Sequence, residues 1–218
     1  MTKIDKIEVP KYSISEEIMN GITHGIGSLL SVAALVLTVV FSAMHGDPWA
    51  VVASSIYGST LIILYTMSTI YHSLKINKGK KVLRIIDHCS IYLLIAGTYT
   101  PYTLVTLNGA LGWTFFGIVW SSAIIGIILN LIDIKKYKKI SMAMYLLMGW
   151  VIIAAIKPLY ESLDIRGLWL LLCGGIIYTL GAVFYGLGKK HKYMHGIFHL
   201  FVLAASILHF FSILLYVI

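Results

Sequence analysis

The chain has 218 residues, of which 59% are hydrophobic and only 12% are charged. Ordinary soluble domains carry about a quarter of charged residues, so this composition excludes a soluble globular fold. The formal net charge of +8 does not indicate nucleic-acid binding, because the basic residues form short clusters between apolar segments rather than a stripe along one helix face.

The chain begins with a polar segment, residues 1–15, which we expect to be a cytoplasmic tail whose first dozen residues are mobile. Ser13 and Glu16 have the spacing of a capping box and predict the start of a helix. The remainder, residues 16–218, is expected to form one all-α membrane domain, a seven-transmembrane helix bundle, since a span needs about 20 apolar residues. The predicted spans lie near 21–43, 50–74, 83–107, 111–132, 140–159, 166–187 and 193–217.

Turn-forming residues separate several of these spans. The His-Gly-Asp-Pro sequence at 45–48 predicts a tight turn after the first span, and Asn108-Gly109 predicts another after the third. Pro101 is expected to kink or locally open the third span, because proline removes a backbone donor. The two cysteines, Cys89 and Cys173, lie inside apolar segments and are expected to be packed thiols.

The distribution of Lys and Arg predicts the orientation of the bundle. Fifteen of the 17 basic residues lie in the N-terminal tail and in the second, fourth and sixth connections. Cytoplasmic connections retain positive charge, so we expect the N-terminus inside and the C-terminus outside. The basic residues of these four segments are Lys3, Lys6, Lys11, Lys75, Lys78, Lys80, Lys81, Arg84, Lys135, Lys136, Lys138, Lys139, Lys189, Lys190 and Lys192.

This orientation places a set of polar residues at one depth, the cytoplasmic end of the bundle. His72 ends the second span, Asp87 begins the third, and His195 and His199 begin the seventh. Ionisable groups in a membrane are costly, so such a cluster is a functional site by default. His195 and His199 are four residues apart, hence one helical turn apart on nearly the same face, and both imidazoles can reach one ion.

A zinc site explains this cluster best. Three neutral imidazoles, from His72, His195 and His199, plus a water would complete the tetrahedral shell of a catalytic zinc ion. Asp87 would then hold or deprotonate that water. Ser68 lies one turn before His72 and either joins the site or bonds back to the carbonyl of Leu64.

Other polar residues lie near this site in the sequence-based arrangement but are not expected to bind the ion directly. Glu17, Asn20 and His24 begin the first span and either surround the ion's ligands or form a solvated entry to the membrane. His88 points about 100° away from its neighbour Asp87, and His209 lies about 15 Å deeper than His199, so neither is expected to share the ion.

The order of these residues resembles the hemolysin III family, the bacterial branch of the progestin and adipoQ receptor superfamily. The matching elements are Glu17-x-x-Asn20-x-x-Thr23-His24, Ser68-x-x-x-His72, Asp87 and His195-x-x-x-His199. The resemblance covers the chain from about residue 16 onward. It implies a multi-pass cell-membrane protein with seven spans and the N-terminus inside. It also implies a zinc ion held by the three histidines, with Asp87 reached through water and Ser68 nearby.

Three functions fit the sequence and the resemblance. The first is a zinc-dependent hydrolase acting on an amide-type bond of a membrane lipid, as proposed for the eukaryotic relatives, with Asp87 as general base. The second is a pore-forming, cytolytic protein, as the family's name suggests. The third is a non-enzymatic, zinc-stabilised regulator of membrane homeostasis. In each case a membrane lipid is the expected substrate or ligand, and no nucleic acid is expected.

Overall fold

The computed structural model describes residues 4–188 and 191–218, and within those ranges it contains helices and no strand. Seven helical segments there are long and apolar enough to cross a membrane, which confirms the predicted seven-span all-α fold. Their bounds are α1 Ile14–His45, α2 Pro48–Ser73, α3 Lys78–Pro101 continued by η2 Tyr102–Leu107, α4 Gly109–Asp133, α5 Lys138–Trp150 continued by η3 Val151–Ala155 and α6 Ile156–Ser162, α7 Ile165–Leu187, and α8 Met194–Tyr216. A short turn, η1 Ile4–Lys6, precedes them.

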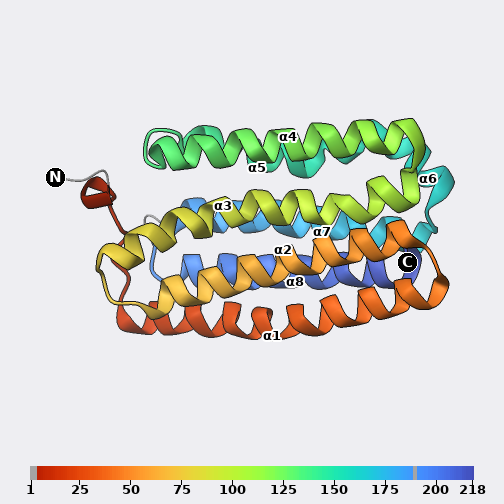
Figure 1. Ribbon diagram of the computed structural model, residues 1–218. Helices are drawn as coiled ribbons and strands as arrows, with labels where there is room; N and C mark the ends of the chain where they lie inside the picture. Colours follow the sequence, from red (N-terminus) through yellow and green to blue (C-terminus); the bar gives the residue numbers. More distant parts are fainter. Residues whose placement is uncertain (1–3, 189–190) are drawn as a thin grey trace.

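The long helices run side by side (Figure 1) and their contacts close a ring. Helix α1 packs between α2 and α8, α3 packs against α2, α4 and α5, and α7 packs against α5 and α8. Helices α4 and α5 lie at the opposite side of the bundle from α1. Because successive spans alternate in direction, α1, α3 and α8 begin at one end of the bundle, where α2 and α7 end. We call this the histidine end.

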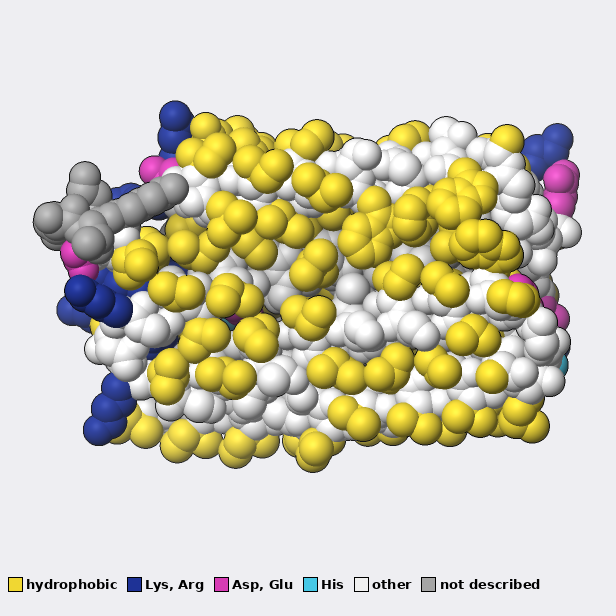
Figure 2. All heavy atoms as spheres, viewed as in Figure 1, with side chains coloured by type: hydrophobic (Ala, Val, Ile, Leu, Met, Phe, Trp, Pro, Cys, Tyr) yellow, Lys and Arg dark blue, Asp and Glu magenta, His cyan; other side chains and the backbone are white. Residues whose placement is uncertain are grey.

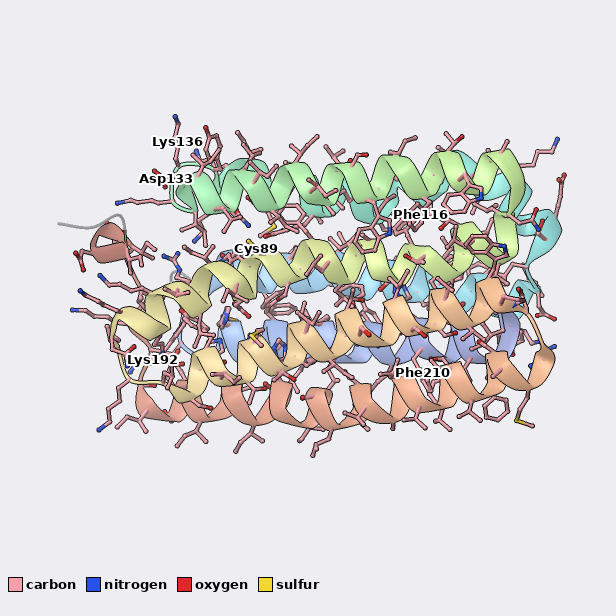
Figure 3. The ribbon with its side chains drawn as sticks, viewed as in Figure 1. Cys89, Phe116, Asp133, Lys136, Lys192 and Phe210 are labelled. Atoms are coloured by element: carbon pink, nitrogen blue, oxygen red, sulfur yellow. The ribbon has the colours of Figure 1, made fainter. Side chains whose placement is uncertain are left out.

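The surface of the bundle fits a lipid environment. Figure 2 shows hydrophobic side chains over the length of the visible face, with Lys and Arg gathered at the ends and most densely at the histidine end. Figure 3 places Lys136 and Lys192 there, as the charge count predicted. Lys3, Lys189 and Lys190 were also counted but lie outside the described residues. The assignment of this end to the cytoplasm stays a prediction from charge.

The predicted helix boundaries have the expected caps. The Ser13 hydroxyl accepts from the Glu16 backbone N–H at 3.3 Å, and the Glu16 carboxylate accepts from the Ser13 N–H at 2.9 Å, so the capping box is present. Gly46 ends α1 in the left-handed conformation (φ 73°). Asn108 and Gly109 both have positive φ, 35° and 50°, which confirms the second predicted turn.

Pro101 opens the third span locally, as predicted. Helix α3 ends at this proline and continues as one π-helical stretch, Tyr102–Leu107. The wider turn brings Tyr102 into the interior, where its hydroxyl donates to the Ser212 hydroxyl of α8 at 2.8 Å. The π segment thus ties α3 to α8 at the end of the bundle far from the histidines.

Small and hydroxylated residues join α1 to α2, as expected for helices that associate within lipid. The Ser28 and Thr66 hydroxyls lie 2.8 Å apart, and so do those of Ser42 and Ser54. Gly27 faces the ring of Tyr65, where an added Cβ would lie only 2.4 Å from a ring carbon. This close approach fixes the register of α1 against α2, and therefore the level of Glu17 and Asn20 relative to His72.

Two further expectations concern the tail and the cysteines. In the described part of the tail, Arg84 donates to the Glu8 carbonyl, Lys81 donates to the Asp5 carbonyl at 2.6 Å, and Lys135 pairs with the Glu8 carboxylate at 2.5 Å; the mobility of the tail stays a prediction. The tail therefore lies against the histidine end. Of the cysteines, Cys89 is buried, but Cys173 is exposed on the outer face of α7 and is not a packed thiol.

Candidate metal centre

Three imidazoles meet at the histidine end of the bundle. His72 comes from the last turn of α2, and His195 and His199 come from the first two turns of α8. One ring nitrogen from each lies within 4.8 Å of the others, an arrangement that could hold a metal ion. The four-residue spacing on α8 therefore acts as predicted, with both rings turned toward α2.

The ring of His72 is held by α1. Its Nδ1 lies 2.6 Å from the Glu17 carboxylate, so Nδ1 carries the proton and donates, and the Asn20 amide nitrogen lies 3.4 Å from the same atom. The other nitrogen, Nε2, is buried and has no hydrogen-bond partner among the described residues. A buried polar atom without a partner is costly, and a metal ion would satisfy it.

The ring of His199 is oriented in the same way. Its Nδ1 lies 3.2 Å from the Asn20 backbone carbonyl, which accepts the Nδ1 proton and leaves Nε2 for a ligand. On its other side the ring stacks on His24, with centroids 3.6 Å apart and planes 9° apart. Both nitrogens of His24 are buried and without a partner in the described part of the chain. Glu17, Asn20 and His24 thus contact His72 or His199, and their role around a metal ion stays a prediction.

Asp87 and Ser68 lie beside these rings rather than among the ligands. Both line one cavity together with His24, His195 and His199. The Asp87 side chain is 15% exposed, and its carboxylate is 3.6 Å from His88 Nδ1. The Ser68 hydroxyl is buried and lacks the bond to the Leu64 carbonyl that was one of its two expected roles.

The cavity continues from this polar end into the apolar interior between α3, α5, α7 and α8. Its volume is about 170 Å³, roughly ten times the space that one ordered water needs. Along α3 it reaches from Asp87 to Tyr102, fifteen residues apart and therefore about 22 Å. His209 lies on its wall near that far end, and its Nε2 is 3.0 Å from the Leu171 carbonyl, as expected for a buried hydrogen-bonding histidine.

The pairing of α1 with α8 holds the site together. The second oxygen of the Glu16 carboxylate accepts from the backbone N–H of Tyr193 at 3.0 Å. Tyr193 is the N-cap of α8 and has a positive φ of 63°. This bond joins the starts of α1 and α8 and sets the level of His195 and His199 against His72.

Two residues at this site were missed by the sequence analysis. Lys80 was counted as a loop cation, but its side chain is 1% exposed and its ammonium lies 2.5 Å from the Glu17 carboxylate. Tyr12, from the tail, stacks on His195 with centroids 5.2 Å apart and planes 18° apart. Burial raises the pKa of the Tyr12 phenol, so this cover is a neutral ring at physiological pH.

A sequence signal for Lys80 was available. Asn77 accepts the backbone N–H of Lys80 at 2.8 Å and is the N-cap of α3. Asparagine is among the preferred N-cap residues, so α3 begins at Lys78 rather than near residue 83. Lys80, Arg84 and Asp87 then recur at helical spacing on one face. Thr23, by contrast, bonds back to the Met19 and Asn20 carbonyls and takes no part in the site.

Comparisons with known proteins agree with these features. A family model described as "Haemolysin-III related" matches residues 12–210. The chain is 50% identical to "Hemolysin-3" of Bacillus cereus over 204 residues, which cover 94% of this chain and 93% of that protein. It is 48% identical to the "Hemolysin-3 homolog" of Bacillus subtilis (strain 168) over 205 residues, covering 94% and 96%.

A more distant human relative is also similar over most of the chain. "Monocyte to macrophage differentiation factor" of Homo sapiens is 31% identical over 205 residues, which cover 91% of this chain and 83% of that protein. The family model's match, residues 12–210, includes the first six spans, the larger part of α8 and the three histidines of the candidate centre. The chain therefore belongs to the hemolysin III family of multi-pass membrane proteins.

Proposed function

We propose that this protein is a zinc-dependent hydrolase that cleaves an amide-type bond of a membrane lipid. One observation carries the proposal: Asp87 and two histidines of the triad, His195 and His199, line the polar end of a long, mostly apolar cavity. A lipid with its chain in the cavity would have its first polar atoms beside the histidines. The mostly apolar walls fit a hydrocarbon chain.

The donor set favours zinc among the common metal ions. His72, His195 and His199 offer nitrogen atoms only, whereas Mg²⁺ and Ca²⁺ take oxygen ligands. Three protein ligands with a further position open to the cavity is the pattern of catalytic zinc sites. The unpartnered, buried Nε2 of His72 supports this fit, since its Nδ1 is already occupied by Glu17.

The chain's own residues supply the remaining chemistry. When bound, zinc would polarise the substrate carbonyl and lower the pKa of a bound water. Asp87 would take a proton from the attacking water, because it lines the same cavity as His195 and His199. The Ser68 hydroxyl would donate to the oxygen that gains charge in the transition state. The apolar walls would exclude bulk water and hold the lipid chain.

Substitution of Asp87 tests whether this residue is needed for hydrolysis without being needed to bind the metal. We expect Asp87→Asn to keep one zinc per chain and to lose about 10²–10⁴-fold in hydrolysis rate, because the substitution removes the base and leaves the three imidazoles. Lipid extracts incubated with the wild-type protein are first screened for released fatty acid or amine. Zinc content is then measured beside the rate on the lipid that is turned over.

The matched control is Asp164→Asn, at the other end of the bundle. Asp164 is an exposed N-cap of α7, and asparagine caps equally well. This variant should match the wild type in both zinc content and rate. Equal turnover by wild type and Asp87→Asn would show that Asp87 is not the base.

The name of the Bacillus cereus relative favours membrane lysis as a second candidate function. A lytic protein would release a dye from lipid vesicles whether or not its histidines are intact. The hydrolase proposal expects no release, since the cavity walls are mostly apolar and offer no water-lined path. A protein that binds zinc, leaves vesicles sealed and turns over no lipid would favour a non-catalytic regulator of the membrane.

A further inference from the structure

We propose that Lys80 is a positioning residue of the metal centre, whose buried ammonium holds Glu17 in the place from which that carboxylate orients His72. The inference rests on the metal centre of the proposed function and is independent of turnover. Lys80 contacts neither the ion nor its ligands and would act on the ligand His72 through Glu17.

Lys80 is buried to a degree that lysine reaches only when its charge is paired. Its side chain is 1% exposed, although the residue lies in the first turn of α3 at the edge of the membrane domain. The ammonium donates to Glu17 at 2.5 Å and to the Leu74 carbonyl at 2.8 Å, and lies 5.1 Å from the centre of the Tyr71 ring. Leu74 is the C-cap of α2, so one ammonium connects α1, the end of α2 and α3.

Glu17 is the only link between this ammonium and His72 in the hydrogen bonds of the described residues. One carboxylate oxygen, Oε1, accepts from Lys80, and the other, Oε2, accepts from His72 Nδ1 at 2.6 Å. The Glu17 side chain is 19% exposed, whereas that of His72 is fully buried. The chain of contacts therefore runs from Lys80 through Glu17 to the ligand, with each carboxylate oxygen used once.

Removing Lys80 should weaken metal binding rather than strengthen it. By Coulomb attraction alone, loss of a nearby positive charge would favour a bound cation. However, the Lys80 ammonium is the contact that holds the Glu17 carboxylate beside His72, and without it this partly exposed carboxylate turns outward to water. The His72 Nδ1–H then loses its anionic acceptor, and with it the ring orientation that leaves Nε2 toward the ion.

The test is the zinc dissociation constant of the purified full-length chain in lipid nanodiscs, measured by competition with a chromogenic chelator. Loss of an outer-shell partner typically costs about 10–100-fold in metal affinity, and we expect a rise of that size for Lys80→Met. The matched control is Lys78→Met. Lys78 lies two residues before Lys80 and carries the same charge, but its side chain is 77% exposed. Lys78→Met should bind zinc as the wild type does.

Further variants separate positioning from general support of the fold. Glu17→Gln should weaken zinc binding by a similar factor. The double variant Lys80→Met/Glu17→Gln should be no weaker than the weaker single variant, since both act on His72 by one route. If Lys80→Met does not fold, Lys80→Gln, which keeps a neutral donor, takes its place and should also raise the dissociation constant. Lys80→Arg, which keeps the charge, should bind more tightly than either neutral variant.

The outcomes distinguish this inference from the centre on which it rests. A lower melting temperature of the metal-free Lys80 variants with an unchanged zinc dissociation constant would overturn the positioning role alone. Full zinc content in alanine variants of His72, His195 and His199 would overturn the centre and this inference together.

Discussion

Two histidines on α8 allow the effect of losing a metal ligand to be separated from the effect of losing a buried ring. His199 and His209 are both buried, and each donates one hydrogen bond to a backbone carbonyl, of Asn20 at 3.2 Å and of Leu171 at 3.0 Å. Only His199 belongs to the candidate centre. The variants His199→Ala and His209→Ala therefore lose similar contacts but differ in the loss of a ligand.

The expected magnitudes follow from these contacts. Each variant should lose about 0.5–1.5 kcal/mol for its hydrogen bond, with a further loss of packing, when the protein is metal-free. Zinc at one hundred times its dissociation constant should stabilise the wild type by about 2.7 kcal/mol. For a chain of this size that corresponds to a rise of about 5–11 °C in melting temperature. His209→Ala should keep this zinc-dependent rise, and His199→Ala should lose it.

The assay is thermal unfolding in detergent with zinc or with a chelator, followed by a thiol-reactive or light-scattering probe. For each variant, the melting temperature with chelator is subtracted from the melting temperature with zinc. The stability that the substitution removes from the metal-free protein cancels in this difference. An equal zinc-dependent rise in wild type and His199→Ala would refute the assignment of His199 as a ligand. Loss of the rise in His209→Ala as well would show that zinc acts through the fold in general.

Two other features of the molecule lead to direct tests. A cysteine placed at Asn108 should be labelled from outside intact cells and one placed at Lys136 should not, because the charge pattern puts these two connections on opposite sides; the reverse pattern would invert the orientation. Tyr12→Ala should speed the loss of zinc to a chelator, since the tyrosine ring covers His195, whereas Tyr12→Phe keeps the ring and should release zinc as slowly as the wild type. Equal rates in all three proteins would mean that the tail does not cover the centre.

The fold was largely predictable because the bilayer leaves few choices. Seven apolar segments, each long enough to span, define the helices, and backbone groups within lipid must bond within their own helix. The turns at Gly46 and at Asn108-Gly109 and the opening at Pro101 followed from local backbone chemistry. The start of α1 at Ile14 also followed from the capping box. The start of the third helix was less exact, because Asn77 caps α3 at Lys78 and the predicted span began near residue 83.

The candidate site was predictable as far as its depth and helix faces could be inferred. The spacing of His195 and His199 and the alternation of the spans place them level with His72. What could not be predicted depends on contacts between helices. The approach of Glu17 to both His72 and Lys80 is set by the packing of α1 on α2, and a charge count treats Lys80 like any loop cation. Similarly, nothing in the sequence brings Tyr12 over His195.

The positions of the three histidines along the chain determine when the candidate centre can form during synthesis of the protein. His72 is synthesised with the second span, but the other two histidines of the candidate centre lie on α8, the seventh span. A nascent chain that stops before Met194 carries one imidazole of the three and no Tyr193 to meet Glu16. In the proposed centre, a metal ion would therefore act only when α8 docks against α1 and α2. A shortage of that metal would leave the first six spans inserted and would expose chains with an undocked α8 to membrane proteases.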